Sequence, residues 1–243
     1  MGMTELAAIA IVIVAGLVRG TTGFGGAMLM TPVLSVLYPP VNAVVIALLL
    51  ETAAALVMFP DAVPKAQWRT LLYLTLPAVF TVPLGGYVLL TLDPSIARKV
   101  ISGVVILFSS MLLFGFRYHG TPRVVTSLAL GSVVGALLGA TSVGAPPVIL
   151  YLLSGPDPIA VTRANLTVFV TAISVIGLAM LAVAGAITGA LATTAVLLTI
   201  PFLLSTWLGG KLFGRLSDTG VRQLALGLML CVGVASLFTW PIY

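Results

Sequence analysis

Charged residues are scarce in this chain. Only 7% of its 243 residues are Asp, Glu, Lys or Arg, whereas an ordinary soluble domain contains about 25%. Hydrophobic residues make up 60% of the sequence. Most of the apolar runs are about 20 residues long, as in membrane-spanning helices, and they lack the alternating pattern of about ten residues that is typical of barrel strands. The composition therefore excludes a soluble domain and predicts an all-α integral membrane protein.

The residue types that build catalytic and metal sites are also rare. The chain has one cysteine, Cys231, and one histidine, His119. A single cysteine excludes an internal disulfide and a cysteine metal cluster. No glycine-rich loop is followed by the lysine of a nucleotide-binding P-loop. We therefore expect no enzyme activity, no metal and no cofactor. The excess of 11 basic over 6 acidic residues is spread singly between apolar runs, which favours a role in membrane topology over nucleic-acid binding.

Glycine gathers at two places inside apolar sequence. Residues 20–26 read GTTGFGG, and residues 139–147 read GATSVGAPP. A helix broken at membrane depth leaves backbone N–H groups free, and lipid tolerates these only where they are buried in protein or line a wet cavity. The runs on either side of the first break, residues 6–18 and 27–37, are short, since 13 helical residues reach about 20 Å across a core of about 30 Å. We interpret them as a re-entrant hairpin, with a pair of short tilted spans as the alternative.

The second half of the chain repeats the first. At an offset of 119 residues, four residues at and just before the first glycine break have the same residue types as four residues at and just before the second. At an offset of 124, nine residues between positions 77 and 114 recur without a gap. The first set is Gly16, Gly20, Thr22 and Gly25, which coincide with Gly135, Gly139, Thr141 and Gly144. We expect the chain to consist of three parts: a first transmembrane repeat (1–116), a cytoplasmic connection (117–123) and a second transmembrane repeat (124–243).

The basic residues predict that the two repeats have opposite orientations. If each repeat crosses the membrane five times, with the hairpin counted as two crossings, seven basic residues lie on one side and two on the other. The seven are Lys65, Arg69, Arg117, Arg123, Arg163, Lys211 and Arg215, and the two are Arg98 and Lys99. Four crossings per repeat would give no bias. Because cytoplasmic loops carry the excess of Lys and Arg, we predict two inverted-topology repeats, each a re-entrant or short helical hairpin plus three transmembrane helices, about ten helical segments in all.

Two charged residues and the break residues are the candidate site. An ionisable residue inside a membrane span is costly and needs a reason. Arg19 is predicted to bind an anion, and Glu51, midway along residues 41–59, is predicted to couple transport to protons. A fixed buried salt bridge between them is the alternative. Arg163 and Asn165 are the candidates for an entry path. The residues expected to contact the substrate are Arg19, Gly20, Thr21, Thr22, Gly23, Gly25, Gly26, Thr141, Ser142 and Gly144. For the Thr and Ser residues, ordinary hydrogen bonding between helices is the alternative.

At these residues the chain resembles the TauE/SafE (TSUP) sulfite-exporter family. The resemblance is carried by the first break with Pro32 downstream, by the second break, and by the glycine pairs at 85–86 and 209–210. Ala145 departs from it, since a further glycine is expected there. The resemblance implies secondary transport of a small sulfur-containing anion, such as sulfite or an organosulfonate, across the bacterial inner membrane. The expected partners are this anion, the lipid bilayer and protons as the candidate coupling ion. A carrier for another solute, or a scaffold subunit of a membrane complex, stays as the alternative, and the oligomeric state is left open.

Overall fold

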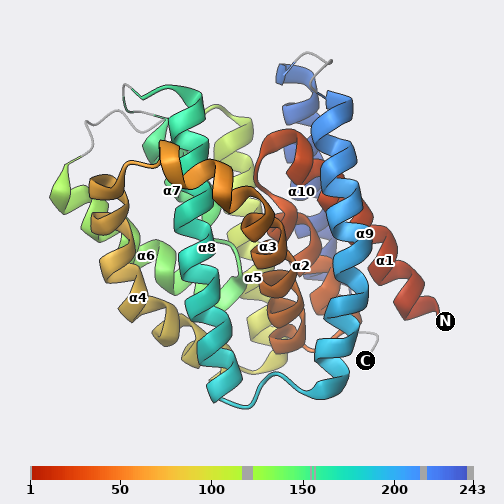
Figure 1. The fold of residues 1–243 in the computed structure, drawn as a ribbon. Coiled ribbons are helices and arrows are strands. Elements are labelled where there is room, and N and C mark those ends of the chain that lie inside the picture. Colours follow the sequence, from red (N-terminus) through yellow and green to blue (C-terminus); the bar gives the residue numbers. More distant parts are fainter. Residues whose placement is uncertain (1, 117–122, 154, 156, 214–217, 240–243) are drawn as a thin grey trace.

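The protein is helical throughout its described parts, which in this computed structural model are residues 2–116, 123–153, 155, 157–213 and 218–239. The helices follow one another with short connections (Figure 1). They are α1 (Met3–Thr22), α2 (Gly26–Leu37), α3 (Pro40–Ala62), the 3₁₀ turn η1 (Val63–Lys65), α4 (Trp68–Thr91), α5 (Pro94–Leu113), α6 (Val124–Thr141), α7 (Ala145–Leu152), α8 (Ile159–Val183), α9 (Gly189–Phe213) and α10 (Asp218–Phe238).

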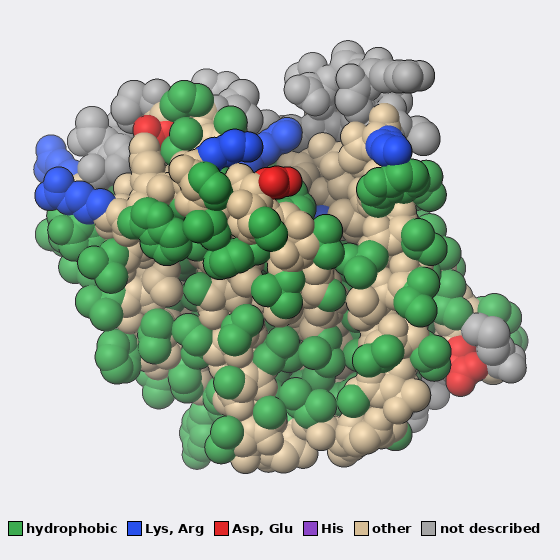
Figure 2. All heavy atoms as spheres, in the orientation of Figure 1, with side chains coloured by type: hydrophobic (Ala, Val, Ile, Leu, Met, Phe, Trp, Pro, Cys, Tyr) green, Lys and Arg blue, Asp and Glu red, His purple; other side chains and the backbone are tan. Residues whose placement is uncertain are grey.

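Seven of the described helices are long and apolar enough to cross a membrane. On the face shown in Figure 2, hydrophobic side chains cover the sides of the molecule, and Lys and Arg gather at its upper end. A lipid environment requires such apolar sides, with exposed Lys and Arg gathered toward the ends of the helices. The expected class, an all-α integral membrane protein, is therefore confirmed. The residues of the predicted connection at 117–123 lie outside the described residues, apart from Arg123.

Each glycine break joins a long helix to a short one. The first helix runs over 20 residues, about 30 Å, and so is longer than the run 6–18 that we expected as one arm of a hairpin. It continues through Arg19 and ends only where the backbone of Gly23 turns left-handed, at φ 80°. In the second half, α6 has 18 residues. The short arms are α2 with 12 residues and α7 with 8.

The two halves exchange their first helices. α1 packs along α9 of the second half, and α6 packs along α4 of the first half. Glycines permit both contacts. A Cβ on Gly20 would overlap the carbonyl oxygen of Thr206, and a Cβ on Gly139 would overlap that of Val82. These two contacts correspond to each other under the offsets of 119 and 124 found in the sequence. The repeat is thus visible in the packing of individual residues.

The remaining contacts follow the same pairing. α3 packs against α8, and α5 packs against α10, so that equivalent helices of the two halves meet. α3 supplies much of the buried interior and runs through the middle of the bundle in Figure 1. This arrangement brings the first break, α3, α8 and the second break together. The inverted orientation of the halves relative to a membrane stays a prediction.

Candidate functional site

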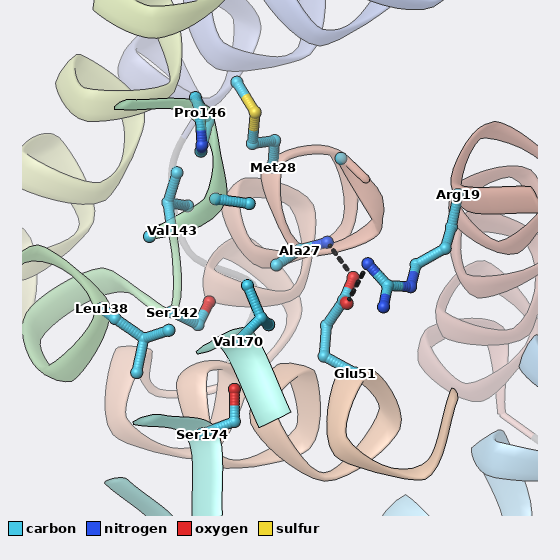
Figure 3. Close-up of a pocket in the computed structure, with 13 residues that line it drawn as sticks. Arg19, Ala27, Met28, Glu51, Leu138, Ser142, Val143, Pro146, Val170 and Ser174 are labelled. Atoms are coloured by element: carbon cyan, nitrogen blue, oxygen red, sulfur yellow. Dashed lines mark hydrogen bonds and ion pairs between the residues drawn. The ribbon is translucent and has the colours of Figure 1, made fainter. Parts of the chain in front are cut away.

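A small cavity lies where the two glycine breaks meet (Figure 3). Its volume is about 20 Å³, which holds about one water molecule. Both halves of the chain contribute to its wall. The lining residues are Arg19, Gly25, Ala27, Met28, Glu51, Leu138, Ser142, Val143, Gly144, Ala145, Pro146, Val170 and Ser174. Four of the predicted substrate residues, Arg19, Gly25, Ser142 and Gly144, and the predicted coupling residue therefore line one space.

The polar wall of the cavity is built around Glu51, at the midpoint of α3. Its Oε2 lies 2.8 Å from Nη1 of Arg19, and its Oε1 accepts a hydrogen bond of 2.8 Å from the backbone N–H of Ala27. Arg19 and Glu51 are only 5% and 4% exposed. The N–H of Ala27 belongs to the first turn of α2, where the helix leaves N–H groups without internal partners and carries partial positive charge. The carboxylate thus occupies an anion site made by a guanidinium and a helix N-terminus.

Two threonines shape the breaks. Thr22 Oγ1 donates to the carbonyl of Val18 and accepts from the N–H of Phe24. Thr141, its counterpart at the offset of 119, donates to the carbonyl of Leu137 and accepts from the N–H of Val143. The hydroxyls therefore close the same turn in each half. Thr21 likewise donates to Val18, at 2.8 Å.

Left-handed backbone ends the long helix of each pair. Gly23 has φ 80° and Ser142, its counterpart, has φ 60°. Glycine adopts this conformation freely, but a serine there is uncommon and is held by its surroundings. The Ser142 hydroxyl lies 2.8 Å from that of Thr31 on α2, which ties the second break to the short helix of the first half. Gly25, at φ 91°, precedes the first turn of α2.

The repeat relation shows that the cavity is asymmetric. At the offset of 119, Arg19, Ala27 and Glu51 correspond to Leu138, Pro146 and Val170, respectively. All six residues line the cavity. The first half therefore supplies a cation, an N–H donor and a carboxylate, whereas the second half supplies two aliphatic side chains and a proline, which has no N–H to donate.

Two polar atoms at the cavity have no hydrogen-bond partner among the residues that the structure describes. They are Nε of Arg19 and the hydroxyl of Ser174 on α8, and both are buried. Buried polar groups are nearly always paired, so an unpaired one at a cavity calls for an explanation, such as a ligand or a water molecule. Ser174 was not among the predicted site residues, because a lone serine in an apolar helix carries no recognisable signal.

The predicted residues that do not line the cavity lie around it. Gly20 sits against α9, where it allows close packing. Gly26 lies directly behind the carboxylate, since a Cβ there would overlap Oε1 of Glu51.

The predicted entry-path residues differ from each other in their surroundings. Arg163 is exposed, and its Nε would lie 4.0 Å from a Cβ on Gly23. Asn165 is fully buried, and its side-chain oxygen accepts a hydrogen bond of 2.7 Å from the N–H of Gln67, just before α4. Arg163 is therefore placed beside the first break, and Asn165 fixes the start of a helix.

A second arginine is buried away from the cavity. Arg98, near the start of α5, is 7% exposed, and within the described part of the chain its Nε and Nη1 have no hydrogen-bond partner. It does not belong to the cavity lining. Among the described residues, no group of His, Cys, Asp or Glu side chains is arranged to hold a metal ion.

The comparison with protein families agrees with this architecture. The model of the family described as "Sulfite exporter TauE/SafE" matches residues 8–236, nearly the whole chain. The chain belongs to the TauE/SafE family. No curated protein and no solved structure matches it. As a TauE/SafE member with seven candidate spans among its described helices, the protein is a multi-pass membrane transporter, and the resemblance read from the glycine breaks is confirmed.

Proposed function

We propose that this TauE/SafE protein is a secondary transporter, working as an exporter, that binds a small sulfur-containing anion in the cavity between the two glycine breaks. The observation that carries the proposal is the polar wall of that cavity. A buried guanidinium, the N-terminus of α2 and an unpaired serine hydroxyl converge there. Such groups stabilise the oxygen atoms of an oxyanion such as sulfite or a sulfonate.

Each group has a distinct part in binding. Arg19 supplies the charge and more than one N–H donor, and its Nε is still unused. Ala27 supplies a backbone donor that a side chain does not shield, because Gly25 and Gly26 precede it. Ser174 supplies a hydroxyl from the opposite side, on α8. An anion held by these three donors would be surrounded by protein at the depth of the α3 midpoint, as in transporters that bind substrate on broken helices.

The other predicted residues surround this site. Glu51 is the proposed coupling residue, with the proton as the ion it carries. Arg163, exposed beside Gly23, is proposed to attract anions from the end where Lys and Arg gather (Figure 2). Asn165 is proposed to position the α4 end of this entry path. In the bacterial inner membrane the basic end would face the cytoplasm, because positive residues are retained on that side.

Flux through proteoliposomes tests the proposal. Purified protein is reconstituted, and uptake of sulfite, sulfoacetate, sulfate and acetate is measured with and without a pH gradient. We expect flux of the sulfur oxyanions that acetate does not inhibit. Arg19→Gln should abolish this flux, while Arg69→Gln, the same change at an exposed arginine, should leave it unchanged. Flux of a different solute class would favour the alternative of another carrier, and no flux of any solute would favour a scaffold.

A further inference from the structure

We propose that the Glu51 carboxylate occupies the anion-binding site until the substrate anion displaces it, and that the displaced carboxylate takes up a proton. One anion and one proton then cross the membrane together. This inference rests on the proposed function and specifies how the same site is coupled. In the structure, the two donors that an oxyanion would use are both taken by this carboxylate. They are Nη1 of Arg19 and the N–H of Ala27, each 2.8 Å from a carboxylate oxygen.

The size of the cavity makes binding an exchange. Its volume of about 20 Å³ holds about one water molecule, which leaves no room for a sulfur atom with three oxygens beside the carboxylate. In Figure 3 the carboxylate lies between Arg19 and the residues of the second break. An incoming anion must therefore displace Glu51 from Arg19 and take over its contacts.

Electrostatics then requires a proton. A displaced carboxylate would remain buried close to the anion, and two like charges in a medium of low dielectric repel each other strongly. Taking up one proton on Glu51 removes that repulsion and the need for a cationic partner. Anion binding and protonation therefore favour each other.

The charged surroundings of Glu51 leave Arg19 as its partner. On the helices packed against α3, α2 has no charged residue. The basic residues of the other neighbouring elements lie at helix ends, where all but one are exposed. They are Lys65 on η1, Arg69 on α4, Arg163 on α8 and Lys211 on α9, and on α5 the buried Arg98 and exposed Lys99. None of these lines the cavity, so none would neutralise the displaced carboxylate.

The asymmetry of the cavity sets the ratio of anions to protons at one to one. The second half offers Leu138, Pro146 and Val170 where the first half offers its three polar groups. It has neither a second cation to bind another anion nor a second carboxylate to carry another proton. A single anion and a single proton therefore form the translocated pair. They move in the same direction, so an exporter of this kind runs on the outward gradient of the anion and carries protons out against the inward proton gradient.

Binding measured against pH tests this coupling. The affinity of the detergent-solubilised protein for methanesulfonate, whose sulfonate remains ionised throughout, is measured by calorimetry from acidic to alkaline pH. Sulfite and sulfoacetate are measured beside it. Because the anion-bound protein holds one more proton than the free protein, the dissociation constant should rise about tenfold for each unit of pH increase. A pH indicator in weak buffer should record the uptake of about one proton for each anion bound.

Glu51→Gln is the diagnostic variant. Glutamine cannot take up the proton, so the affinity should lose its pH dependence and exceed that of the wild type at alkaline pH. Added anion should also raise the melting temperature of Glu51→Gln more than that of the wild type, because it replaces the missing partner of Arg19. A purely structural ion pair would not produce this difference. Asp61→Asn, which removes an exposed carboxylate from the same helix, is the matched control and should behave as the wild type.

The outcomes separate the two proposals. Binding by the wild type with no pH dependence and no proton uptake would overturn the coupling proposed here and leave the anion site standing. The same pH dependence in Glu51→Gln would also overturn it. Failure of all three anions to bind at any pH would instead refute the proposed function. If Glu51→Gln does not fold, the pH dependence of binding and the proton uptake of the wild type still test the proposed coupling.

Discussion

Replacing Gly20 by alanine tests whether this glycine serves packing or substrate binding. Its added Cβ would overlap the carbonyl oxygen of Thr206 and lie 2.7 Å from the backbone nitrogen of Gly210. Both are backbone atoms of α9, so no side chain can turn aside and α1 would have to move away from α9. Overpacking a tight contact costs about 1–3 kcal/mol, and the rigidity of these atoms places Gly20→Ala near the upper value.

The repeat provides a second variant, and the chain offers a control. Gly139→Ala should cost a similar amount, because its Cβ would overlap the carbonyl oxygen of Val82 and lie 2.8 Å from the nitrogen of Gly86. At Gly103, inside α5, a Cβ meets nothing within 4 Å. Since alanine favours a helix over glycine by about 0.5–1 kcal/mol, Gly103→Ala should be neutral or slightly stabilising.

Denaturant unfolding in detergent micelles, with reconstituted flux as the second readout, distinguishes the two roles. The packing role predicts that Gly20→Ala and Gly139→Ala lower the free energy of unfolding, with flux reduced only as far as folded protein is lost. If Gly20→Ala unfolds at the wild-type denaturant concentration and yet has lost its flux, the packing argument is refuted and Gly20 belongs to the substrate site.

Three further predictions concern topology, the carboxylate and a helix cap. In a cysteine-free background, single cysteines at Lys65 and Ser95 should label from opposite faces of sealed vesicles, with Lys65 on the cytoplasmic face; labelling from one face would contradict the proposed orientation. Gly26→Ala should weaken methanesulfonate binding in calorimetry, because its Cβ would overlap the position of Oε1 of Glu51, which the anion is proposed to take over, and unchanged affinity would count against the site. Asp93, exposed before α5, has the pKa of its carboxyl lowered by hydrogen bonding to the side chain of Ser95 and to its backbone N–H, the latter at 2.8 Å. This cap should therefore stabilise the protein above the ordinary pKa of aspartate and be lost as the pH falls through the lowered value, whereas Asp93→Asn should keep its melting temperature over that range.

The sequence predicted the class of fold and the location of the breaks because both depend on local composition. Scarce charge indicates a membrane protein, and clustered glycine marks where helices stop. The helix ends were less well predicted. Nothing in the run 6–18 shows that α1 continues to Thr22, because its last turn is stabilised by packing against α9 and by hydroxyl bonds within the break.

The roles of single residues within the breaks required the structure. Gly20 and Gly25 look alike in the sequence, yet Gly20 faces a neighbouring helix while Gly25 lines the cavity. Only tertiary contacts distinguish them. The pairing of Arg19 with Glu51 was anticipated from the cost of burying charge. The contribution of Ala27 was not, because a backbone N–H has no signature in the sequence beyond its place at the start of a helix.

The exchange of first helices between the halves affects how the protein is made. α1 leaves the ribosome early, but α9, the helix that its glycine face fits, is among the last segments to be synthesised. During most of translation, the glycine face of α1 that packs against α9 therefore has no helix to cover it. Neither half can complete its own interior, so the native fold forms only when nearly the whole chain has been inserted. A nascent chain stalled before α9 would hold Arg19, the proposed anion-binding residue, on a helix whose glycine face has no partner.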